Sequence, residues 1–106
     1  MKIAICQINT VIGDIELNKN KIINWYQKAQ SSDAELVIFP ELSLVGYPPL
    51  DLVEKKEFRY AVNEAAKEIA SLTDSVGLIF GSITEDDDMI GTHVHNSAIL
   101  CYDGKI

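Results

Sequence analysis

A carboxylate that directly follows a buried strand is the first feature of this sequence that could do chemistry. Residues 36–39 are a continuous apolar run, which is typical of a strand buried on both faces, and Pro40 cannot donate to a sheet ladder. The strand should therefore end at Pro40. Glu41 then lies just beyond the carboxyl end of a strand, where open α/β sheets usually hold their sites, and a glutamate there could act as a general base. A solvated loop glutamate is the commoner alternative.

The residues around Glu41 carry a resemblance to a known family. Phe-Pro-Glu at 39–41, Gly-Tyr-Pro-Pro at 46–49 and Asp-Leu at 51–52 together resemble the first catalytic motif of the carbon-nitrogen hydrolase (nitrilase) superfamily. The Phe-Pro-Glu part is shared across that superfamily. The Gly-Tyr-Pro-Pro continuation is similar to one branch of it, the glutaminase domain of glutamine-dependent NAD synthetases.

The resemblance implies a reaction and roles for particular residues. In the family a cysteine thiolate attacks a carboxamide carbon, ammonia leaves, and water activated through the glutamate hydrolyses the thioester, while a lysine stabilises the oxyanion. It implies that Glu41 is catalytic and that Tyr47 lines the glutamine pocket, the alternative for Tyr47 being to pack its loop against the domain. The ammonia would supply an NAD synthetase part, and the ATP and magnesium requirement would belong to that missing part.

The sequence departs from the family pattern in the rest of the catalytic set. The family's lysine and nucleophilic cysteine lie beyond the strand that ends near Tyr102, so we expect neither here. Cys6 and Cys101 each lie in an apolar stretch, where thiols are usually inert, and Lys105 directly follows a predicted turn. We therefore expect residues 1–106 to be the incomplete N-terminal portion of a glutaminase domain, without turnover by themselves.

Other polar residues give weaker signals. Ser43 has no histidine and aspartate arranged around it, which disfavours a serine hydrolase. His93 and His95 alternate as metal ligands could, but no third ligand is near them, so we expect no metal site. The acidic run at 85–88 is expected to be a solvated loop. Asn96, at the Asn-Ser-Ala step that the family also shows, is expected to be structural.

Composition limits the class of partner. The chain has 106 residues, 47% of them hydrophobic, and a formal net charge of −7, which disfavours nucleic acid and anionic membranes because both require basic patches. A small or positively charged partner is a better fit. The two cysteines show no disulfide framework, and the sequence shows no signal peptide or transmembrane run, which favours a reducing, cytoplasmic setting.

Hydrophobic periodicity predicts an α/β fold in which strands and helices alternate, and the family resemblance implies that it is part of the αββα sandwich of nitrilases. A helix should start at a cap on Asn18 and run to about Gln30, and another should occupy 54–72 behind a capping box of Asp51 and Glu54. Strands are predicted at 2–8, 36–39, 77–83 and 96–102, with a hairpin turn at 103–104.

Two further expectations arise from this incomplete sandwich. One sheet face and one strand edge lack partners, so we expect a homo-oligomer. Two alternatives to the glutaminase stay open at the sequence level. One is another amidase or nitrilase of the superfamily, and the other is a non-catalytic interaction module, since the chain holds a single member of the family's catalytic set.

Overall fold

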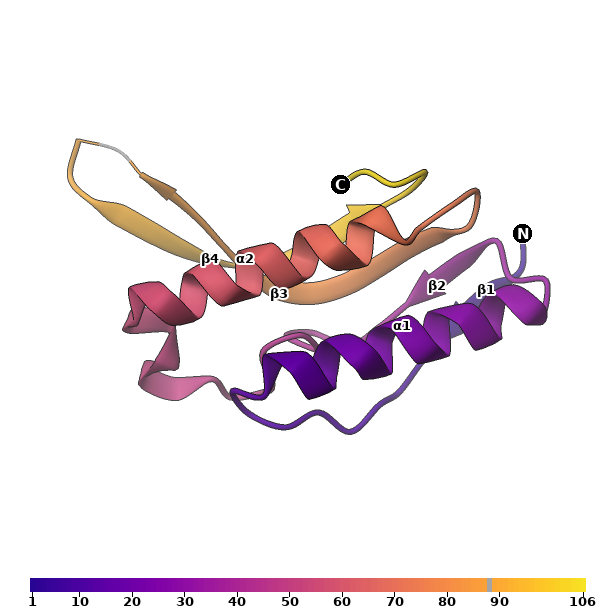
Figure 1. Ribbon diagram of the computed structural model, residues 1–106, viewed down its shortest axis with the longest axis horizontal. Helices are drawn as coiled ribbons and strands as arrows, with labels where there is room; N and C mark the ends of the chain where they lie inside the picture. Colours follow the sequence, from indigo (N-terminus) through magenta and orange to yellow (C-terminus); the bar gives the residue numbers. More distant parts are fainter. Residues whose placement is uncertain (88) are drawn as a thin grey trace.

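The computed structural model describes residues 1–87 and 89–106 (Figure 1). Its elements, in chain order, are β1 (Ile3–Ile5), α1 (Ile15–Ser31), β2 (Leu36–Ile38), the 3₁₀ helix η1 (Leu50–Glu54), α2 (Lys56–Ser71), β3 (Gly77–Asp87) and β4 (Thr92–Cys101). None of the helices in these two described ranges is long and apolar enough to cross a membrane.

The strands form one mixed sheet in the order β1-β2-β3-β4. β1, β2 and β3 are parallel, and β4 returns antiparallel to β3. The two helices are the crossovers between the parallel strands, and Figure 1 shows them side by side over the sheet. The predicted α/β class is confirmed, and the chain forms one helix layer on one sheet.

The two faces of the sheet differ in burial. Val37, Leu78 and Cys101 are register partners in one row, and all are at most 1% exposed beneath the helices. The next row is Ile5, Ile38, Ile79 and Leu100, on the opposite face because strand side chains alternate. In that row Ile5 is 74% and Leu100 56% exposed. One apolar face of the sheet is therefore open.

The start of α1 differs from the prediction. Its cap is Asp14, whose Oδ1 accepts a hydrogen bond from the Leu17 N–H at 3.1 Å. Asn18, the predicted cap, lies one turn inside the helix and is fully buried. Both residue types cap helices well, so the sequence pattern could not separate them. Hydrogen bonds from Asn18 to the backbone of Val11 and Leu44 explain its place.

The predicted capping box of α2 is wrong. Asp51 and Glu54 belong to η1, which begins after Pro49, and Lys55 then adopts an extended conformation before α2 starts at Lys56 without a side-chain cap. A proline-fixed turn thus uses the residues that would have formed the box. The buried side chains of α2 are Val62, Ala65, Ala66, Ile69 and Ala70. The helical period of apolar residues that predicted this helix is confirmed at three of them, Val62, Ala65 and Ile69. Ala61 and Leu72 fit the same period but are exposed.

The β3–β4 hairpin is longer than predicted. The described residues of the acidic run, 85–87, are paired in β3, and His93 and His95 lie in β4. Residue 88, the last of that run, lies outside the described residues. The pairing continues because backbone hydrogen bonds do not require apolar side chains. Figure 1 shows this part of the hairpin projecting away from the sheet body, beyond the helix layer.

The predicted turn at 103–104 is confirmed. Tyr102 and Lys105 exchange backbone hydrogen bonds of 2.9 and 3.1 Å, and Asp103 and Gly104 both have positive φ, at 54° and 79°. Positive φ at both central residues defines the type I′ turn that Asp-Gly favours.

Candidate active site

Glu41 follows the end of β2 as predicted. The last ladder bond on this side runs from the Phe39 N–H to the Ile79 carbonyl at 2.8 Å, and Pro40 then ends the pairing. Glu41 begins a compact turn in which the Ser43 and Gly46 N–H groups donate back to the carbonyls of Pro40 and Leu42. The glutamate is exposed, whereas residues 42–46 behind it are buried.

The turn after Pro40, residues 40–46, is attached to β3 at Gly81. The Leu44 N–H donates to the Gly81 carbonyl at 3.1 Å, and the Gly81 N–H donates to Ser43 Oγ at 3.2 Å. A Cβ atom at position 81 would lie 2.2 Å from the Leu42 nitrogen, so only glycine permits this approach. Ser43 is 1% exposed and serves this contact, in keeping with the expectation that it is no hydrolase nucleophile.

Asn18 attaches the same turn to the segment before α1. Its Nδ2 donates to the carbonyls of Val11 and Leu44 at 2.8 and 3.0 Å, and its Oδ1 accepts from the Val11 N–H at 2.9 Å. Gly46, with φ +83°, packs where a Cβ atom would lie 2.6 Å from the Ile12 Cα. The backbone that carries Glu41 is thus held from two sides.

The Glu41 carboxylate meets a side chain from β4. Asn96 Nδ2 donates to Glu41 Oε1 at 2.6 Å, and no other hydrogen bond to Glu41 is formed by the described residues. The two side chains border a shallow depression of about 360 Å³ on the open face of the sheet. The carboxylate is therefore anchored through one oxygen, and its second oxygen is available to accept a proton beside a space for a small molecule.

Tyr47 lies apart from this depression. Its side chain is 68% exposed, and it is not among the described residues that line the depression. Such exposure does not fit the alternative role of packing the loop against the domain. Its predicted role in glutamine binding stays a prediction.

The thiols and Lys105 are not placed for nucleophilic chemistry with Glu41. Burial raises the pKa of the Cys101 thiol to about 11 and also raises the pKa of Cys6, so both are poor thiolates near neutral pH. Lys105 is exposed in the turn after β4. The part of the chain that the structure describes places no cysteine or lysine in the lining of the Glu41 depression.

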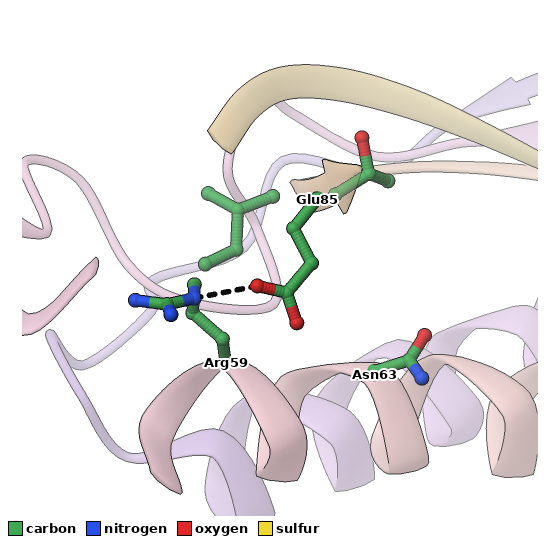
Figure 2. Close-up of a pocket in the computed structure, with 5 residues that line it drawn as sticks. Arg59, Asn63 and Glu85 are labelled. Atoms are coloured by element: carbon green, nitrogen blue, oxygen red, sulfur yellow. Dashed lines mark hydrogen bonds and ion pairs between the residues drawn. The ribbon is translucent and has the colours of Figure 1, made fainter. Parts of the chain in front are cut away.

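A second, smaller pocket of about 130 Å³ lies between α2 and β3 (Figure 2). There Arg59 Nε donates to Glu85 Oε2 at 2.6 Å, and Nη1 donates to the Val53 carbonyl at 2.9 Å. Figure 2 shows Asn63 beside this pair, projecting from α2. The ion pair joins α2 to β3 and the second hydrogen bond joins α2 to η1, so Arg59 holds the start of α2 against the sheet.

The described residues offer no cluster of side chains that could bind a metal ion. His95 Nε2 lies 3.2 Å from Asp86 Oδ1 across the hairpin, and both residues are exposed. Within residues 1–87 and 89–106, no group of three or more His, Cys, Asp and Glu is arranged to hold a metal ion.

Sequence reasoning missed three residues that build this site. Asn96 was expected to be structural and Asn18 to be a helix cap, while Gly81 falls inside the predicted strand at 77–83. Only Asn96 had a signal in the sequence, because the Asn-Ser-Ala motif at 96–98 resembles the same family as the Phe-Pro-Glu motif that contains Glu41. The contacts of Gly81 and Asn18 join segments distant in sequence, and periodicity carries no information about them.

Comparison with known proteins places the chain among relatives. It is 31% identical over 105 residues to the glutamine-dependent NAD(+) synthetase of Acinetobacter baylyi, and the aligned region covers 99% of this chain and 19% of that protein. It is 32% identical over 108 residues to the enzyme of the same name from Thermotoga maritima, covering 100% and 18%. The chain thus spans about a fifth of the length of these curated relatives.

Solved structures agree with this fold. The glutamine-dependent NAD+ synthetase of Acinetobacter baumannii superposes with a TM-score of 0.86 at 32% identity, over 98% of this chain and 19% of that one. An amidase from Nesterenkonia sp. matches with a TM-score of 0.70 at 21% identity, over 92% and 37%, which shows a shared fold. The family model of carbon-nitrogen hydrolases matches residues 2–105. Since that match spans nearly every residue, including the strand-end glutamate, the chain belongs to the carbon-nitrogen hydrolase family.

Proposed function

We propose that this chain is the N-terminal part of the glutaminase domain of a glutamine-dependent NAD synthetase. The Acinetobacter and Thermotoga relatives support this branch of the family, and the Gly-Tyr-Pro-Pro loop at 46–49 resembles the same branch. The observation that carries the proposal is Glu41 itself. It lies at a strand end, on a turn held from two sides, with one carboxylate oxygen anchored by Asn96 and the other accessible.

In the proposed reaction Glu41 is the general base. It accepts a proton from a cysteine thiol, whose sulfur attacks the carboxamide carbon of glutamine and forms a tetrahedral intermediate. The proton passes to the leaving nitrogen, the C–N bond breaks, and ammonia departs. Glu41 then takes a proton from the water that attacks the thioester, which releases glutamate and the thiol. The cysteine and an oxyanion-stabilising lysine would come from sequence outside these residues.

The other partners depend on this proposal. Glutamine is the small-molecule substrate, and Tyr47 lines its pocket once the rest of the domain is present. ATP and Mg²⁺ would serve the synthetase part, and no residue of this chain is assigned to them. We also propose a cytoplasmic homo-oligomer that binds neither nucleic acid nor membranes, in keeping with the net charge of −7.

A comparison of chain lengths tests the proposal. A longer polypeptide that contains this chain, with a lysine and a cysteine in the continuation, should release ammonia from glutamine and form NAD from it with ATP. Residues 1–106 alone should release none, because the nucleophile is missing. Turnover by the isolated chain that survives both Cys6→Ala and Cys101→Ala would contradict the mechanism, and so would a longer polypeptide that hydrolyses other amides but not glutamine.

A further inference from the structure

We propose that Asn96 is a positioning residue for Glu41, which fixes the carboxylate so that Oε2 is the oxygen that accepts the proton. This inference rests on the proposed function. The contact that carries it is the 2.6 Å hydrogen bond from Asn96 Nδ2 to Glu41 Oε1, which joins residues 55 apart in sequence. Asn96 is thereby given a part in the reaction without contact with the reacting atoms.

The backbone of Asn96 is well fixed. It is paired with Ile83 in the middle of the β3–β4 ladder, which runs from Leu78↔Cys101 to Asp87↔Thr92. Thr84 and Ser97 lie on the two ladder steps that flank this pair, and their hydroxyls are 2.7 Å apart, which ties the two strands together. The amide therefore projects from a rigid element, which is the better support for a residue that orients another.

Glu41 needs such a support because its side chain is otherwise unrestrained. The turn fixes its backbone through Gly81, but the side chain is exposed and has several rotatable bonds, each with alternative staggered wells. The amide of Asn96 selects among these orientations. The primary amide nitrogen donates and cannot accept a proton at neutral pH, so Oε1 is committed to it and Oε2 is left to act as the base.

Kinetics of the complete polypeptide test this role. Asn96→Ala should lower the glutamine-dependent kcat roughly tenfold to a hundredfold, the range expected when a reacting group loses its alignment, with little change in KM. NAD formation from added ammonium chloride should be unchanged. Asn63→Ala is the matched control, because Asn63 is exposed on α2, and it should leave both rates unaltered.

A double-mutant cycle separates positioning from a structural role. In a Glu41→Gln background the base is already lost, so Asn96→Ala should cost less than about twofold more if it acts through the carboxylate. If Asn96→Ala lowers kcat in the Glu41→Gln background by as much as it does in the wild type, the proposal is overturned. An Asn96→Ala protein with the wild-type kcat would overturn it as well. If Glu41→Gln itself keeps full glutamine turnover, the assignment of Glu41 falls and the positioning role falls with it.

A variant of equal size guards against misfolding. Asn96→Asp preserves shape but replaces the donor with a carboxylate facing Glu41, and it should reduce glutamine turnover at least as much as Asn96→Ala. Asn96→Asp should also lower the melting temperature, because two carboxylates then face each other. When Asn96→Asp is combined with Glu41→Gln, the side-chain amide at position 41 can donate to the carboxylate at position 96. The melting temperature should then return toward the wild-type value, while glutamine turnover stays low. Recovery of turnover in this pair would contradict the assignment of roles.

Discussion

At the scale of single residues, the site depends on groups whose function is to leave room or to satisfy buried polar atoms. Asn18 is fully buried and makes hydrogen bonds with the backbone of Val11 and Leu44. Buried peptide groups need partners because water cannot reach them, so this side chain replaces solvent for two loops at once. Gly81 contributes in the opposite way, by having no side chain.

Gly81→Ala should displace the turn that carries Glu41. A Cβ atom there would lie 2.2 Å from the Leu42 nitrogen and 2.6 Å from the Pro40 oxygen, and both are backbone atoms that cannot rotate away. We expect a loss of about 2 kcal/mol or more in the free energy of unfolding. Glutamine turnover by the complete polypeptide should fall with it. Urea denaturation and ammonia release measure the two effects.

Gly77→Ala is the matched control on the same strand. Its Cβ atom would lie 3.0 Å from Leu36 Cδ1, the end of a flexible side chain that can move. The expected change in stability is within about 1 kcal/mol, and turnover should be retained. Equal effects of the two substitutions would show that Gly81 has no particular relation to the Glu41 turn.

At the scale of elements, the sheet has one covered face and one open face. The open row of Ile5, Ile38, Ile79 and Leu100 runs across all four strands, and β1 and β4 are both edge strands. Apolar faces and unpaired edges of this kind recruit partners. In an αββα sandwich a second sheet of the same domain would cover this face.

The isolated chain should therefore self-associate through the open face. Leu100→Lys, at a position 56% exposed in that row, should shift the chain toward monomer because it places a charge in the contact. Leu17→Lys, on α1 and 38% exposed, is the control and should leave association unchanged. Light scattering over a wide concentration range measures both. A chain that is monomeric throughout and unfolds cooperatively would contradict this expectation.

At the scale of the whole molecule, the sequence predicted what local patterns encode. The order of strands and helices, the end of β2 before Pro40 and the Asp103-Gly104 turn follow from periodicity, proline geometry and turn chemistry, which act over a few residues. Glu41 was located because its neighbours resemble a family motif. Periodicity also predicted the centre of the buried face of α2, at Val62, Ala65 and Ile69.

Contacts between distant segments explain part of what the sequence did not reveal. The cap of α1 and the hydrogen bond from Asn96 to Glu41 both depend on such contacts. Competition between two suitable caps, Asp14 and Asn18, was resolved by the backbone groups of Val11 and Leu44. The outer half of the hairpin was not predicted because its side chains are polar, and its pairing depends on backbone hydrogen bonds that leave no hydrophobic pattern.

The central claim is that Glu41 is the base of a glutamine-hydrolysing site, and paired rates on one variant test it most directly. Glu41→Gln keeps the shape of the side chain but removes the proton acceptor needed for both thiol activation and water attack. Glutamine-dependent NAD formation by the complete polypeptide should fall on the order of a hundredfold to ten-thousandfold. Ammonia-dependent formation should survive nearly intact, because it bypasses glutamine hydrolysis. Equal loss of both rates, or loss of neither, would contradict the claim.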